Sequence, residues 1–205
     1  MDFYCEKVFP RLMDLAMSRA RNRPVRDRVC GPLAGDVLEV GFGSGRNLPH
    51  LPASVSALLA VDPMEAGQHL ATERLSATTV PVEFVGLDGA ALALPDDSVD
   101  SALSTWTLCS IPNPVAAARE IVRVLRPGGV LRFVEHGRSP EPRTASWQRR
   151  LNPIQQRIAC GCHLDRDIPT ILREGGLNVT ELDTYYMSGE LKVLGWTFEG
   201  SARAA

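Results

Sequence analysis

The chain has 205 residues, of which 44% are hydrophobic and 22% are charged. This length and balance are typical of one globular domain with a sizeable core, and they exclude a mainly disordered chain. The 22 Lys and Arg residues against 24 Asp and Glu give a formal net charge of −2, so no nucleic-acid partner is expected. No apolar run is long enough to cross a membrane, the acidic start does not resemble a signal peptide, and the five cysteines lack framework spacing. We therefore expect a cytoplasmic protein with no need of disulfides.

Short apolar runs bounded by Gly, Pro or Asp alternate with helix-like segments along most of the chain. Such runs are typical of buried parallel strands, and the alternation predicts βαβ units. The last two runs lie close enough in sequence to form an antiparallel pair. We expect a Rossmann-like α/β fold, with a doubly wound, seven-stranded, mostly parallel sheet and one antiparallel strand near the C-terminus. The expected strands are 36–40, 57–62, 82–87, 99–105, 130–135, 179–186 and 193–199.

The segments between the strands carry apolar residues at helical spacing. Asn113 and Pro114 suit the N-cap and first position of one helix, and Pro127-Gly128-Gly129 predicts a turn that ends it. We expect a single domain over 1–205, with an N-terminal helical segment (1–30) and a variable insert (136–167). The expected helices are 65–77, 115–125, 147–159 and 167–174.

A glycine cluster, Gly41-Phe42-Gly43-Ser44-Gly45, follows the first expected strand directly. Glycines in this position let the chain turn tightly and bring backbone N–H groups close to a ligand. The dinucleotide fingerprint would place its third glycine at Arg46, and the prolines that follow disfavour a long helix there. Glu39 before the loop and Asp62 at the next strand end put two acids at the site, which suits a ligand that carries positive charge. A nicotinamide-dependent oxidoreductase stays open as the second class of function.

The order of these motifs resembles the class I S-adenosylmethionine-dependent methyltransferases over about residues 33–136. The glycine cluster, Val61-Asp62-Pro63, Asp88-Gly89 and the segment 119–129 carry the resemblance. It implies S-adenosylmethionine as the cofactor, S-adenosylhomocysteine as its product, and a small-molecule acceptor. The implied cofactor-binding residues are Glu39, Gly41, Gly43, Gly45, Asp62, Pro63, Met64, Asp88, Gly89 and Thr105. Asp62 would hold the ribose hydroxyls, Asp88 the adenine amino group, and the Thr105 carbonyl the ligand ammonium.

A narrower resemblance extends to about residue 199. The segments 107–110 and 133–136, Trp147 and the segment 161–166 are similar to the methyltransferase-like 7 family, whose members are membrane-associated and methylate small alkyl thiols. Residues 1–30 lack the hydrophobic anchor of that family. The resemblance alone favours a thiol as the acceptor, and a lipid amine and a quinone-like phenol stay open. A binding module without catalysis also stays open.

His136 is the candidate catalytic base, because it ends the fifth strand at the carboxyl edge where open α/β sheets bind their ligands. A structural histidine is the competing interpretation. Trp106 and Cys109 follow the fourth strand at the same edge and either line the acceptor pocket or pack in the core. Tyr4 and Trp147 are candidates for a cover over that pocket.

Two further patterns carry less weight. Cys160-Gly161-Cys162-His163 has no matching Cys/His pair elsewhere, so no metal site is expected. Arginines are dense between residues 19 and 28, at Arg19, Arg21, Arg23, Arg26 and Arg28. Such a run is most often a solvated helix face, and it also suits weak contact with a membrane surface. The sequence does not indicate an oligomeric state.

Overall fold

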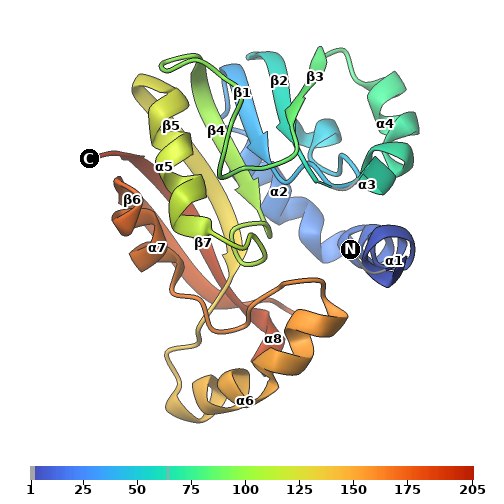
Figure 1. Ribbon diagram of the computed structural model, residues 1–205, viewed down its shortest axis with the longest axis vertical. Helices are drawn as coiled ribbons and strands as arrows, with labels where there is room; N and C mark the ends of the chain where they lie inside the picture. The colour runs from blue at the N-terminus through green and yellow to red at the C-terminus, as the bar shows by residue number, and fades with distance from the viewer. Residues whose placement is uncertain (1–2, 64) are drawn as a thin grey trace.

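The computed structural model describes residues 3–63 and 65–205, and their strands form one seven-stranded sheet (Figure 1). The strand order is β3-β2-β1-β4-β5-β7-β6, and β7 is antiparallel to both of its neighbours while the other pairs are parallel. The predicted fold class is confirmed. The strands are β1 (Gly35–Val40), β2 (Val55–Val61), β3 (Val82–Gly86), β4 (Val99–Thr105), β5 (Leu125–His136), β6 (Leu177–Tyr186) and β7 (Trp196–Ala204).

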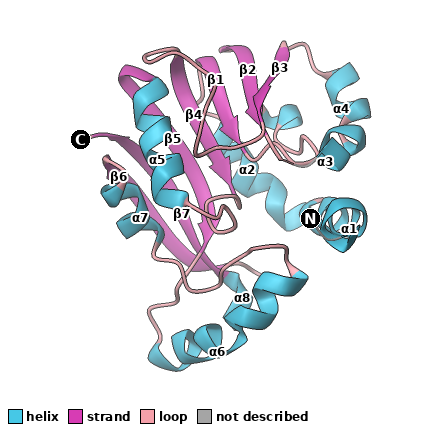
Figure 2. Ribbon diagram, viewed as in Figure 1, coloured by secondary structure: helices cyan, strands magenta, loops and turns pink. Residues whose placement is uncertain are grey.

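Helices cover both faces of the sheet, as Figure 2 shows. On one face α5 packs against the sheet and α7 lies between α5 and the edge strand β6, while α2 lies on the opposite face. A π-helical turn (Tyr4–Val8) and 3-10 turns at Ala20–Asn22 and Leu48–His50 complete the helical segments among the described residues. The α-helices are α1 (Phe9–Met17), α2 (Arg23–Cys30), α3 (Glu65–Leu70), α4 (Thr72–Ala77), α5 (Pro114–Val124), α6 (Pro142–Ile158), α7 (Ile168–Glu174) and α8 (Lys192–Gly195).

Two apolar cores follow from the alternation of side chains along the strands. In β1, Leu38 packs with the core under α5 and α7, whereas its neighbour Val37 packs with the core under α2. Successive residues of a strand point to opposite faces, so one short run supplies both cores. Phe133 and Leu103 are likewise fully buried, one in each core.

The predicted helix start at Asn113 is confirmed, because its side-chain oxygen accepts a hydrogen bond of 3.1 Å from the Ala116 N–H. The predicted turn at Pro127-Gly128-Gly129 is wrong in part: β5 already begins at Leu125 and runs through it. Val99 pairs with Leu125 and Ser101 with Val130, so β5 carries an irregular register there. Pairing with β4 therefore extends the strand, and Gly128 accommodates the distortion at a φ of 84°.

Three other boundaries differ from the sequence prediction. The helix expected over 65–77 divides at Ala71 into α3 and α4, and α6 begins five residues before the expected 147. The strand expected over 193–199 begins with the short helix α8, and β7 runs from Trp196 to Ala204. The start of α6 has a local signal, because Pro142 suits the first turn of a helix. Ala71 is buried in the core, and β7 pairs with β5 and β6, which local periodicity does not report.

The strand order reverses between β1 and β4, which places a crevice at their carboxyl ends. Helices α1 and α6 both lie past this edge of the sheet (Figure 1). The edge is where open α/β sheets bind ligands, and it is where the glycine cluster and the loop after β4 meet.

Candidate active site

A cavity of about 1200 Å³ opens at the carboxyl ends of β1 and β4. Its wall combines the glycine loop after β1, the loops after β2, β3 and β4, the end of β5, helix α1 and the segment after α6. Of the expected site residues, those on the wall are Gly41, Gly43, Asp62, Pro63, Asp88, Gly89, Thr105, Trp106, Cys109 and His136. The fold thus gathers residues from five strand ends around one space.

The glycine loop holds a backbone shape that only glycine adopts easily. Gly41, Gly43 and Gly45 have φ angles of 84°, 56° and 69°. A Cβ at Gly41 would lie 1.9 Å from the Thr107 hydroxyl oxygen, whereas a Cβ at Gly43 would meet no atom within 4 Å. The loop is therefore packed tightly at its start and open toward the cavity at Gly43.

The acids after β2 and β3 lie at the same edge of the sheet. Asp62 is 3% exposed, and its Oδ2 accepts a 2.6 Å hydrogen bond from the Gly43 N–H. Asp88 is exposed at the cavity rim, and its Oδ1 accepts a 2.8 Å bond from the Ala90 N–H. The expected neighbour Met64 lies outside the described residues.

The predicted site residue Glu39 is buried behind the cavity wall, which its neighbour Val40 lines, and one of its carboxylate oxygens is unsatisfied. Its Oε1 accepts a 2.6 Å hydrogen bond from Asn47 Nδ2, while its buried Oε2 has no hydrogen-bond partner. Complete burial raises the pKa of Glu39 to about 8, and the nearby Arg26 guanidinium opposes that rise. A cation that reaches Oε2 would satisfy the orphan oxygen and favour the carboxylate.

Arg26 and Asn47 are functional candidates that the sequence analysis missed. Arg26 is buried, donates to Asn47 Oδ1, and stacks over the Trp106 ring with its guanidinium carbon 5.0 Å from the ring centre. Asn47 also donates to the Thr105 hydroxyl at 3.0 Å. Arg26 comes from α2, Asn47 lies 21 residues further on, and Trp106 follows β4, so no local sequence pattern could have linked the three.

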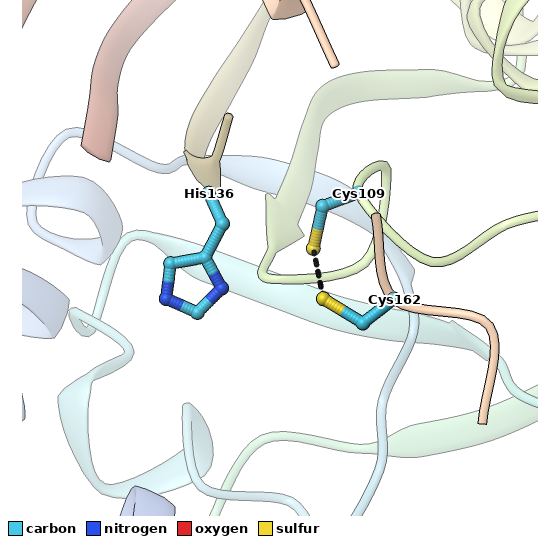
Figure 3. A group of neighbouring side chains, drawn as sticks. All are labelled: Cys109, His136 and Cys162. Carbon is cyan, nitrogen blue, oxygen red and sulfur yellow. Dashed lines mark hydrogen bonds between the residues drawn. The ribbon is translucent and has the colours of Figure 1, made fainter. Parts of the chain in front are cut away.

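Two thiols and an imidazole meet at the other end of the cavity (Figure 3). Cys109, after β4, and Cys162, after α6, have their sulfur atoms 3.8 Å apart, and His136 at the end of β5 lies beside them. The hydrogen bond between the thiols and the neighbouring His136 lower the pKa of Cys162, whereas that hydrogen bond and burial raise the pKa of Cys109. Cys162 was not singled out by sequence as a site residue, because its partners are 53 and 26 residues away.

The two expected cover residues do not line the cavity. Trp147 is 55% exposed on α6, where Arg150 stacks on its ring. Tyr4 donates a 2.8 Å hydrogen bond to the Ile158 carbonyl, so it joins the N-terminal segment to the end of α6. Gly45 is also absent from the cavity wall, and a Cβ at this position would lie 2.9 Å from the Phe42 ring and 3.1 Å from a Leu48 methyl group.

The expectation of a chain without disulfides is wrong, because Cys5 and Cys160 form one, with their α-carbons 5.7 Å apart. Cys160 is therefore not part of a Cys-x-Cys thiol pair. The bond joins the N-terminal segment to the insert across 155 residues of sequence. Free cysteines in the described chain are Cys30, Cys109 and Cys162, all buried.

Helix α1 is also fastened to the glycine loop. Arg46 donates from Nε and Nη2 to the two carboxylate oxygens of Asp14 at 2.7 and 2.6 Å. This bidentate pair is the strong form of a charge-assisted contact. Arg46 thus holds the N-terminal segment over the cavity, a role that its place in the glycine motif did not suggest.

Comparisons with known proteins agree with this geometry. Residues 38–133 match the family described as "Methyltransferase domain". The chain is 30% identical over 185 residues to the thiol S-methyltransferase TMT1B of Rattus norvegicus, which covers 80% of this chain and 72% of that protein. A demethylmenaquinone methyltransferase of Clavibacter sepedonicus is 31% identical, covering 58% of this chain and 49% of that protein.

The fold is shared with a methyltransferase of Haloferax volcanii that was solved in complex with the Trm112 methyltransferase activator. The TM-score is 0.72 at 19% identity, and the match covers 97% of this chain and 98% of that one. No helix in the described residues is both long and apolar enough to span a bilayer.

Proposed function

The chain belongs to the class I S-adenosylmethionine-dependent methyltransferases, and from this premise we propose that it methylates a small-molecule acceptor, with a thiol as the acceptor class. The family expected from the motifs is confirmed, and the nicotinamide-dependent alternative is wrong. S-Adenosylmethionine, when bound, supplies a methyl group already activated on a sulfonium sulfur. The residues of this chain must therefore bind the donor, orient the acceptor, exclude water and manage the acceptor proton.

The donor end of the cavity fits a cationic sulfur nucleoside. The glycine loop is open at Gly43, Asp62 is buried beside it, and Glu39 has a buried oxygen without a partner. In this proposal Asp62 binds the ribose hydroxyls and Asp88 the adenine amino group, with Pro63 and Gly89 beside the base. Glu39 and the Thr105 carbonyl then face the positively charged end of the donor.

The acceptor end carries the single observation on which the thiol assignment depends. His136 lies beside two thiols at the end of β5, on the wall of the same cavity that Gly43, Asp62 and Asp88 line after β1, β2 and β3. A thiol acceptor loses its proton as its sulfur forms the new carbon–sulfur bond, and His136 is the proposed group that promotes this loss. Trp106, which lies 6.4 Å from His136 between ring centres, is proposed to pack against the acceptor.

We also propose that residues 3–30 act as a lid within a single domain, with the segment 136–167 as the second cover. The Asp14–Arg46 pair and the Cys5–Cys160 bond support this role, because they hold the lid to both neighbours of the cavity. Several arginines of the run in the lid bind other residues of this chain. Arg21 pairs with Glu190, and Arg28 pairs with Glu199. This leaves less free charge for the weak membrane contact that the run suggested.

A methyl-transfer screen tests the acceptor class. The purified chain is incubated with methyl-labelled donor and matched alkyl thiols, amines and phenols, and label is counted in the product. We expect turnover on small alkyl thiols and at least about 100-fold less turnover on amines of the same size. A thiol reacts as its thiolate, whereas an amine must lose its proton from nitrogen before it can attack. Turnover confined to phenols would favour a quinone-type acceptor, and turnover confined to amines would favour a lipid amine. Either result would contradict the thiol assignment and leave the methyltransferase assignment intact.

A further inference from the structure

The cluster at the acceptor end has the composition of a metal site. Cys109, His136 and Cys162 each offer one ligand atom, and these three atoms lie within 4.8 Å of one another. They come from the β4–α5 loop, the end of β5 and the segment after α6. Figure 3 shows the imidazole and both sulfur atoms directed into one small space. Three ligands brought together from three distant segments form an arrangement that the sequence motif Cys160–His163 did not predict.

The sulfur–sulfur distance matches that of two thiolates on one zinc ion. Zinc–sulfur bonds are about 2.3 Å long, and tetrahedral angles then place two bound sulfurs about 3.8 Å apart. The two sulfurs of this protein are separated by 3.8 Å. A disulfide would need about 2.05 Å between them. The side chains thus have the separation for an ion between them and are too far apart to be bonded to each other.

Contacts outside the cluster fix the two loops that carry the cysteines. The Cys109 N–H donates to Glu135 Oε2 at 3.1 Å, and the Cys109 carbonyl accepts from the His163 N–H at 2.8 Å. The Arg166 guanidinium donates to the Leu108 carbonyl and so joins the two loops that carry the cysteines. Ligands fixed by their surroundings need little reorganisation to bind, which is the usual arrangement around metal sites.

We propose that Cys109, His136 and Cys162 bind a thiophilic divalent cation, Zn²⁺, and leave its fourth position open to the cavity. Two thiolates neutralise the ion, and three protein ligands with an open position are typical of catalytic zinc. Both cysteines are at least 92% buried, so the charges would be shielded from water. All three residues line the cavity, so the open position faces the acceptor.

The consequence for the reaction rests on the proposed function. An acceptor thiol that enters the fourth position gives its proton to solvent, because thiols on zinc are deprotonated. Its sulfur then uses one electron pair to form a bond to the methyl carbon. The bond between that carbon and the donor sulfur breaks, its electron pair stays on the donor sulfur, and the product thioether leaves. His136 then acts as a ligand in place of a base.

Metal binding is measured without reference to activity. The full chain is freed of metal with a chelator under argon, without reductant, and titrated with Co²⁺ and with Zn²⁺ against a chromophoric chelator. We expect one ion per chain and the near-ultraviolet sulfur-to-cobalt absorption of two thiolates. Cys109→Ser, Cys162→Ser and His136→Ala should each lower zinc affinity by more than about 100-fold. Circular dichroism and binding of S-adenosylhomocysteine report whether each variant is folded.

Matched controls come from the same chain. Cys30→Ala removes the third free buried thiol, and His163→Gln alters the histidine next to Cys162, whose ring faces Asn152 and Gln156. Both should bind zinc like the parent protein. Absence of the cobalt–thiolate absorption, or equal zinc affinity in folded Cys162→Ser, would overturn the proposal. If S-adenosylhomocysteine binds and no metal binds, the metal-site proposal is wrong and the proposed function stands. If S-adenosylhomocysteine does not bind, the proposed function is wrong whether or not a metal binds.

Discussion

The Gly43 N–H donates a 2.6 Å hydrogen bond to Oδ2 of Asp62, so the loop after β1 and the acid after β2 form one unit. The bond crosses from one parallel strand end to the next and involves a buried carboxylate. A hydrogen bond to a charged group contributes about 1.5–3 kcal/mol to the stability of the fold. This bond therefore fixes the position of the glycine loop relative to the proposed ribose-binding acid.

Asp62→Asn should weaken binding of S-adenosylhomocysteine by about 10- to 100-fold, because an amide replaces the charged acceptor of the ribose hydroxyls and of Gly43. Isothermal titration calorimetry measures the affinity directly. Asp36→Asn is the matched control, because Asp36 lies at the other end of β1 and pairs with Arg126. Equal affinity of Asp62→Asn and the parent would remove Asp62 from the binding site.

Glu39 should make the stability of the free protein depend on pH. Burial raises its pKa in the folded chain to about 8, above the 4.5 of an exposed glutamate. Between these values the folded state holds a proton that the unfolded state has lost, so the free energy of unfolding falls as pH rises from about 4.5 to 8. Glu39→Gln should flatten this decline and melt at a higher temperature than the parent at pH 8.5. Thermal melts of both proteins across that range, without ligand, test this, and parallel curves would argue against it.

The same substitution should weaken donor binding while it stabilises the free chain. A neutral amide cannot offer negative charge to the cationic end of S-adenosylmethionine. We expect a loss of about 10-fold in affinity for the donor and a smaller loss for the uncharged thioether of S-adenosylhomocysteine. An equal loss for both would mean that Glu39 does not face the sulfonium.

Removing the Cys5–Cys160 bond should destabilise the fold and free the lid. Replacing both cysteines by Ala opens a loop of 155 residues, and bonds of this kind contribute about 2–4 kcal/mol. The release rate of S-adenosylhomocysteine, followed by stopped flow, should rise several-fold. Peptide mapping without reductant checks the pairing first; five free thiols in the purified chain would show that the bond does not form.

His136→Ala should lower the rate of methyl transfer by about 100- to 10,000-fold and leave the affinity for S-adenosylhomocysteine nearly unchanged. This holds whether His136 accepts the proton or binds a metal, because the residue lies at the acceptor end. His163→Ala serves as the control, since its ring contacts Asn152 and Gln156. A normal rate in His136→Ala would exclude both roles.

Residues that follow a strand directly were predictable from sequence. Gly41, Asp62 and His136 lie at or directly after the ends of apolar runs that the sequence identifies as strands. The carboxyl ends of parallel strands meet at one edge of the sheet, so these residues were expected there. The start of β5 was not predictable in this way. The local sequence from Pro127 to Gly129 is typical of a turn, and it forms part of a strand only because β5 pairs with β4.

Contacts between segments that are far apart in the chain could not be predicted from the sequence. The partners Arg26 and Asn47 meet through the packing of α2 behind the sheet, and Cys5 and Cys160 meet because two separate segments pass the same opening. Trp147 illustrates the opposite error, since an aromatic residue near the site in sequence lies on the outer surface of α6. Proximity along the chain predicted strand ends well and predicted side-chain partners poorly.

The covalent link between Cys5 and Cys160 has a kinetic meaning. The two segments that border the cavity cannot move apart independently, so we expect nucleoside and acceptor to enter and leave through a restricted opening. Whichever molecule sits deeper has to arrive first and depart last, and the enzyme should therefore obey a compulsory order of addition for as long as that bond stays oxidised.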